Sequence, residues 1–166
     1  ISPVKSLGLN YPDIVSVGPT GIEEDRRFYL VNGRGDLLTQ REIGTLVQIT
    51  AEYQTNPEML RIITPNVGVW EGALELGKKT TTAVFGRSVH GQIVNGGFGE
   101  FLSEYCRHDV QLIRSDRPGQ CHDEYPVSLI SQASLDALTK QQRSGVIFDS
   151  RRFRPSFLIE GCQAHE

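Results

Sequence analysis

The chain has 166 residues, with 17 basic and 20 acidic side chains and a formal net charge of −3, so it lacks the basic excess of a general nucleic-acid-binding protein. Hydrophobic residues make up 38% and charged residues 22%, which is enough apolar material for a folded core and too little charge for a disordered chain. No apolar run approaches the length of a membrane-spanning helix, and the first residues lack the apolar region of a signal peptide.

Strands dominate the first hundred residues, where Gly and Pro recur and the apolar runs are short and rich in β-branched or aromatic residues. We expect strands at 28–31, 37–39, 46–53, 60–64, 80–85 and 88–94. Asn32-Gly33 favours the positive φ angles of a tight hairpin turn, and Gly86-Arg87 marks a second hairpin. Short strands at this spacing predict a barrel or a strongly curved sheet.

The composition changes after Asn95-Gly96-Gly97. The apolar residues at 98, 101, 102 and 105 lie on one face of a predicted helix, and a strand is expected at 110–113. A polar loop at 114–125 precedes a second helix, which Ser131 begins as N-cap and Gly145 ends. The last strand, 157–159, has no evident partner. The sequence therefore predicts a β-rich α+β fold with a boundary near Asn95, dividing the chain into 1–94 and 95–166.

The cysteines and histidines show no pattern of a structural metal site. Three cysteines without a Cys-x-x-Cys pair argue against a disulfide framework and indicate a reducing compartment, so we expect a cytoplasmic protein. The four histidines lack metal-ligand spacing. Cys121-His122-Asp123 are sequence neighbours, which do not face one another as a catalytic triad must. These residues are Cys106, Cys121, Cys162, His90, His108, His122 and His165.

Three basic segments could bind an anion. Lys5-Ser6 offers an ammonium, a hydroxyl and backbone amides. Arg26 and Arg27 would point to opposite faces of a strand, so one of them could enter a cleft. Arg151-Arg152-Phe153-Arg154 concentrates guanidinium groups, whose planar fork suits phosphate. For each segment taken alone, solvated surface charge is the more common explanation, and Arg34-Gly35-Asp36 is explained by its hairpin turn.

Taken in order, five motifs resemble one family. They are Pro3-Val4-Lys5-Ser6, Asp25-Arg26-Arg27-Phe28-Tyr29-Leu30-Val31, Leu38-Thr39-Gln40-Arg41-Glu42, Ser131-Gln132-Ala133-Ser134-Leu135 and Phe153-Arg154-Pro155-Ser156. Their order and approximate spacing are similar to MOSC proteins with an N-terminal β-barrel domain, MOSC being the domain at the C-terminus of molybdenum cofactor sulfurases. The resemblance implies that 1–94 form the barrel-like domain and that 95–166 form the first part of a truncated MOSC domain.

The resemblance also implies a molybdenum cofactor (molybdopterin) site between the two halves. The residues that match its phosphate ligands are Lys5, Ser6 and Arg27. Arg154 matches an arginine that also lines the site, and we expect these four to converge on one pocket. In the family a pterin dithiolene and a cysteine thiolate hold the molybdenum. The matching cysteine would lie beyond Glu166, and Cys162 matches a different, upstream cysteine, so no metal ligand is assigned in this chain. The 114–125 loop is shorter than is usual in the family.

Three functions follow as hypotheses. The leading one is an oxidoreductase that reduces N-hydroxylated compounds with electrons from a partner reductase. The alternative is a non-catalytic cofactor-binding or sulfur-carrier module with the same pocket, and the third is a protein-interaction domain. The sequence begins with Ile1 rather than Met, so we expect it to start inside a longer chain, and we expect the fragment alone to be inactive.

Overall fold

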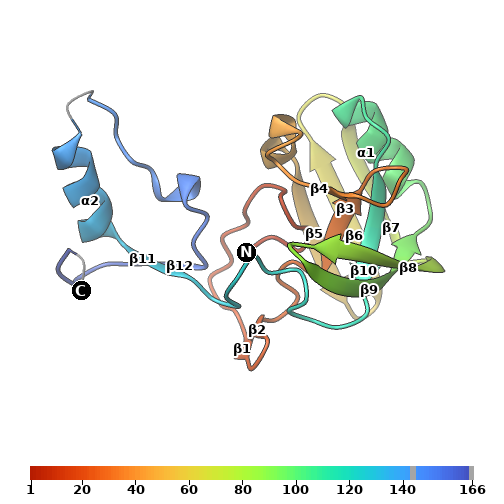
Figure 1. Ribbon diagram of the computed structural model, residues 1–166, viewed down its shortest axis with the longest axis horizontal. Helices are drawn as coiled ribbons and strands as arrows, with labels where there is room; N and C mark the ends of the chain where they lie inside the picture. The colour runs from red at the N-terminus through yellow and green to blue at the C-terminus, as the bar shows by residue number, and fades with distance from the viewer. Residues whose placement is uncertain (143–144, 165–166) are drawn as a thin grey trace. The chain divides into compact units, whose positions relative to one another are not determined.

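The structure is a computed structural model that describes residues 1–142 and 145–164 (Figure 1). It contains two compact units, Ile1–Glu124 and Tyr125–Glu166, which are described separately below. The expected boundary near Asn95 lies within the first unit, and the assignment of 95–166 to a partial MOSC domain stays a prediction. His165 lies outside the described residues.

Two antiparallel sheets make up most of the first unit (Figure 1). The larger has the order β4-β3-β10-β9-β8, with bounds Leu37–Leu38, Phe28–Val31, Gln111–Ser115, Arg87–Val94 and Leu76–Val84. The smaller has the order β5-β6-β7, with bounds Thr50–Thr55, Glu58–Thr64 and Gly68–Ala73. A small hairpin pairs β1 (Val17–Gly18) with β2 (Gly21–Ile22), and the α-helix α1 spans Phe98–Cys106.

Strand β3 is buried on both faces, which explains why its sequence is apolar without interruption. Phe28 and Leu30 face the main core, to which β5, β6, β10 and α1 also contribute. Tyr29 and Val31 face a second, smaller core that includes Cys121. Residues that flank β3 in the chain are therefore held next to two packed layers.

The predicted hairpin after β3 is confirmed, but its turn is longer than the Asn-Gly pattern indicates. Leu30 pairs with Leu38, and the Asn32 N–H donates to the Asp36 carbonyl at 3.0 Å. The Asn32 side-chain oxygen accepts from the amides of Arg34 and Asp36 at 2.9 and 3.0 Å, as Asn does in turns. The positive φ of the turn, +85°, falls at Gly35.

The second hairpin, β8–β9, is also confirmed. Val84 pairs with Arg87, so the turn residues are Phe85 and Gly86, one position earlier than expected. Their φ angles of +47° and +80° are those of a two-residue turn that matches the twist of the strands.

The strand predicted at 46–53 is wrong in its first half, where a 3₁₀-helix, η1, spans Gly44–Gln48. Ile43, Leu46 and Ile49 are all buried, whereas Val47 is 45% exposed. This spacing of three follows the turn of a 3₁₀-helix, and it outweighs the alternation read from the sequence. The strand begins only at Thr50.

Helix α1 and strand β10 are confirmed. The helix buries Phe98, Phe101, Leu102 and Cys106, close to the predicted face, while Tyr105 lies at the edge of the core. The strands β1, β2 and β7 were not expected from the sequence. β7 is exposed at five of its six positions, so it carries no burial pattern that a sequence could display.

The second unit contains β11 (Leu129–Ser131), α2 (Gln132–Gln141), η2 (Ser150–Arg152) and β12 (Phe157–Ile159). Ser131 caps α2 as predicted, because its hydroxyl accepts from the Ser134 amide at 3.1 Å. The helix ends at Gln141, before the predicted stop at Gly145. The partner of β12 is β11, in parallel register.

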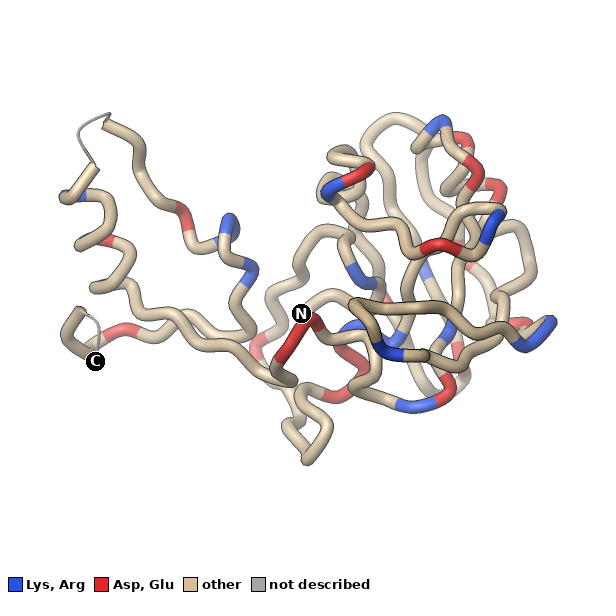
Figure 2. Tube along the Cα trace, viewed as in Figure 1, with Lys and Arg blue, Asp and Glu red and all other residues tan. Residues whose placement is uncertain are grey.

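The predicted fold class, a β-rich α+β protein, is confirmed. Between the two larger sheets the described residues show side-chain packing rather than strand pairing, so the hydrogen-bonded ladder is not a closed cylinder. In the first unit acidic and basic positions are interspersed along the trace (Figure 2).

Candidate functional site

The segment Pro3–Ser6 lies alongside the start of β3. Val4 forms a parallel bridge with Phe28, the Lys5 amide donates to the Phe28 carbonyl at 2.8 Å, and the Phe28 amide donates to the Pro3 carbonyl at 2.9 Å. Ser6 follows with a φ of +75°. This backbone pairing holds the predicted residues Lys5 and Ser6, both buried, near the strand that Arg27 precedes.

Lys5 carries a buried ammonium, with 3% of its side chain exposed. Its Nζ donates to the Cys121 carbonyl at 2.9 Å and to Asp123 Oδ1 at 3.0 Å, and it lies 4.9 Å from the centre of the Phe85 ring. Burial lowers the pKa of Lys5, while Asp123 acts in the opposite direction. Two of the three donors of the ammonium are thus fixed by acceptors of the loop that follows β10.

Arg27 is the second buried cation, with 9% of its side chain exposed. Its Nε lies 3.5 Å from Glu24 Oε2, an ion pair without a hydrogen bond between the two groups. Among the described residues, neither Nε nor Nη1 has a hydrogen-bond acceptor. Burial raises the pKa of Glu24, against the effect of Arg27 and Arg114. The guanidinium therefore keeps buried donors that suit an oxyanion.

Lys5 and Arg27 share a neighbour in Cys121. The positive charges of Lys5, Arg27 and Arg87 all act on its thiol, yet burial raises the pKa of Cys121 to about 11. Such a thiol stays protonated and is a poor nucleophile. Two of the predicted cations, 22 positions apart in sequence, thus lie close enough to one buried thiol for both charges to act on its pKa.

Hydrogen bonds to its backbone carbonyls hold the loop after β10 in place. Arg87 Nη2 donates to the carbonyls of His122 and Asp123, the latter at 3.0 Å. The His122 ring lies 3.2 Å from the Thr20 carbonyl through Nε2, and burial lowers the pKa of His122. Burial raises the pKa of Asp123, but the Lys5 ammonium outweighs this and holds it below its ordinary value. Cys121, His122 and Asp123 thus each have separate partners and do not form a triad.

Arg154 belongs to the second unit, shortly after η2, and has a φ of +51°. Its convergence with Lys5, Ser6 and Arg27 stays a prediction, because these three lie in the first unit.

A second polar network was missed by the sequence analysis. Arg114 Nη2 donates to Glu58 Oε1 at 2.6 Å, and the Tyr53 hydroxyl donates to the same oxygen at 2.8 Å. Burial, together with Glu58, raises the pKa of Tyr53 to about 12. Arg114 and Glu58 are 56 positions apart, and no local motif could have signalled their contact.

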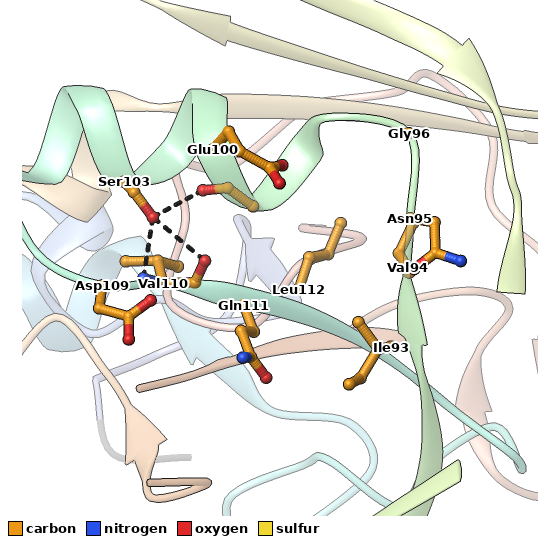
Figure 3. A pocket seen from close by; sticks show the side chains of 11 residues that line it. Ile93, Val94, Asn95, Gly96, Glu100, Ser103, Asp109, Val110, Gln111 and Leu112 are labelled. Atoms are coloured by element: carbon orange, nitrogen blue, oxygen red, sulfur yellow. Dashed lines mark hydrogen bonds between the residues drawn. The ribbon is translucent and has the colours of Figure 1, made fainter. Parts of the chain in front are cut away.

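A cavity of about 390 Å³ lies elsewhere in the first unit, between α1, β9 and β10 (Figure 3). Glu100 and Asp109 contribute carboxylates to its lining, which contains neither Lys nor Arg. Ser103 donates to the Gly99 carbonyl at 2.7 Å and accepts from the Val110 amide at 2.9 Å, so it links the helix to the start of β10. The carboxylates of this cavity would repel a phosphate, so the cavity is not a candidate phosphate site.

Two further properties of the described chain bear on function. Within residues 1–142 and 145–164, no three side chains among His, Cys, Asp and Glu gather as a metal site. Over the same residues, no helix combines the length and apolar character that crossing a bilayer requires.

Residues 1–109 match a family model described as the MOSC N-terminal beta barrel domain. The chain belongs to this family. The match covers well over half of the chain and includes the opening motif and the β3 motif, so the resemblance drawn from those residues is confirmed. The MOSC N-terminal domain assignment also agrees with the β-rich first unit.

No curated protein matches the chain. Among solved structures, it is similar to the solution structure of a Bordetella bronchiseptica protein identified by its gene locus. The TM-score is 0.44 and the identity 15%, over 60% of this chain and 78% of the other. A likeness at this level carries no functional argument.

Proposed function

We propose that this chain is part of a molybdenum-cofactor-binding MOSC protein, and that the whole protein is an oxidoreductase that reduces N-hydroxylated compounds with electrons from a partner reductase. The membership of the MOSC N-terminal family supports the class. The observation that carries the proposal is the buried guanidinium of Arg27, whose Nε and Nη1 have no hydrogen-bond acceptor among the described residues. The cysteine usage favours the cytoplasm as its compartment.

The residues fit the phosphate of the cofactor in number and kind. A phosphate presents several acceptor oxygens and is bound best by guanidinium forks and ammonium groups from separate elements. Arg27 would supply the fork, Lys5 a buried ammonium, and Ser6 a hydroxyl with its backbone amide. Arg154 is the fourth residue that the family resemblance assigns to the cofactor.

Each of these residues would act on the phosphate rather than on the reacting atoms. They would bind and orient the cofactor and exclude water from its phosphate end, while the molybdenum, when bound, supplies the redox chemistry. Burial raises the pKa of Cys121 to about 11, so this thiol stays protonated and is not offered as the thiolate ligand of the metal.

The test is to express the full-length gene in a host that makes the cofactor and to measure molybdenum and pterin by mass spectrometry. We expect both to copurify with the wild-type protein. Arg27→Lys keeps the charge but loses the fork, and it should lose most of the bound pterin. Arg34→Lys, in the exposed hairpin turn, is the matched control and should keep it. Neither molybdenum nor pterin in the wild-type protein would contradict the proposal.

A second assay separates the oxidoreductase from the carrier module. The loaded protein is supplied with an electron donor and a hydroxylamine-type substrate, and reduction is followed over time. Turnover supports the enzyme, whereas stable cofactor binding without turnover supports a cofactor or sulfur carrier.

A further inference from the structure

The carboxylate of Asp123 occupies one of the three donors of the buried Lys5 ammonium. It is 3.0 Å from Lys5 Nζ, and 63% of its side chain is exposed while that of Lys5 is 3% exposed. Solvent therefore meets the carboxylate before it meets the ammonium. Burial raises the pKa of Asp123, while the charges of Lys5, Arg26 and Arg41 all act to lower it.

The loop is fastened by its backbone and not by the Asp123 carboxylate alone. The Cys121 carbonyl accepts from Lys5 Nζ at 2.9 Å, and Arg87 Nη2 binds the carbonyls of His122 and Asp123. A rotation of the Asp123 side chain would release one Lys5 donor without breaking these bonds. The carboxylate can thus leave while the loop stays in place.

We propose that Asp123 is a built-in competitor for the anion site at Lys5, which a bound phosphate displaces. This inference rests on the proposed function, in which Lys5 holds a phosphate. A carboxylate and a phosphate use the same charge-assisted donors and repel each other at short range, so they compete for the ammonium. The site then discriminates against weakly charged anions, because only an oxyanion that gains additional contacts, as at Arg27, replaces the internal one.

The experiment uses full-length protein from a host without the cofactor and titrates inorganic phosphate at constant ionic strength by calorimetry. Asp123→Asn keeps the size of the side chain and an acceptor oxygen for Lys5, so the fold is retained. Because an ion pair with an exposed partner contributes little free energy, we expect about fivefold tighter phosphate binding in this variant. Glu124→Gln removes the same charge one residue away and should leave the affinity unchanged.

The outcomes separate the two proposals. Three outcomes would contradict the role of Asp123 as a competitor while leaving the proposed anion site at Lys5 intact. Phosphate could bind equally well to wild type and Asp123→Asn, bind more weakly to Asp123→Asn, or bind equally more tightly to Asp123→Asn and Glu124→Gln. No binding to any of the three proteins would overturn the phosphate site and the competitor together. In the double variant Lys5→Met with Asp123→Asn the gain should disappear, and a gain that persists would place the competing anion elsewhere.

Discussion

At the scale of single residues, the candidate site is a set of charged groups held out of water. Lys5 and Arg27 are both at least nine-tenths buried at the side chain, and each keeps an acidic partner, Asp123 or Glu24. Buried charges without partners are strongly destabilising. Because each has an acidic partner, Lys5 and Arg27 can be buried when the chain folds.

The Glu24 carboxyl gives a prediction on pH dependence. Burial raises its pKa above the ordinary 4.5. At pH values between the pKa of the unfolded state and that of the folded state, the folded state therefore binds more protons than the unfolded state. Stability from this group must then fall as the pH rises through that window. We expect the free energy of unfolding of wild type, relative to Glu24→Gln, to increase as the pH is lowered from about 7 towards about 4.5.

Urea unfolding of both proteins at a series of pH values measures this difference. Glu104→Gln, an exposed carboxyl on α1, serves as the control for a general charge effect. A difference that decreases on acidification would show that the Arg27 charge outweighs burial at Glu24.

Part of this site is predictable from sequence and part is not. Lys5, Ser6 and Arg27 stand in motifs whose order carries information, so they could be named. Asp123 could not be assigned to Lys5, because 118 positions separate the two and only the pairing of β3 with β10 brings the following loop to the opening segment.

At the scale of elements, the sequence pattern predicts helices and strands correctly where buried residues recur at regular intervals. β3, α1 and the β8–β9 hairpin have apolar spacing or turn residues that correspond directly to their structure. It fails at η1, where the sequence alternates like a strand although the buried residues Ile43, Leu46 and Ile49 recur at intervals of three. It also fails at β7 and β11, which exist because β6 and β12 pair with them.

The φ angles of the β3–β4 turn distinguish two turn geometries that the same sequence could adopt. An Asn-Gly turn would require positive φ at Gly33, whereas the structure has it at Gly35, at +85°. A side chain in that conformation costs about 1 kcal/mol or more. Gly35→Ala should therefore destabilise the protein by about this amount.

Gly33→Ala is the matched control, because its new methyl group meets only the end of the Asp109 side chain, which can rotate away. Thermal unfolding of both variants decides the matter. A larger loss of stability in Gly33→Ala than in Gly35→Ala would support the two-residue Asn-Gly turn instead.

At the scale of the whole molecule, composition and pattern were enough for the fold class, but the grouping of elements depends on packing between distant segments. The first unit has two apolar cores that share β3. In the second unit, Leu135 is the buried hydrophobic residue among those described, while Leu129, Ile147 and Leu158 are 63%, 76% and 44% exposed. The two units should therefore differ in local stability.

Hydrogen exchange of the 166-residue chain, read by mass spectrometry, tests this difference. Amides of β3 and β10 lie beneath two packed layers and open only with the first unit as a whole, so we expect them to be the slowest to exchange. Amides of β11, α2 and β12 have little buried apolar surface above them, and we expect them to exchange in the earliest time points. The β3 amides act as an internal reference in the same sample. Protection of β12 that equals or exceeds that of β3 would mean that the second unit is stabilised by contacts beyond its own residues.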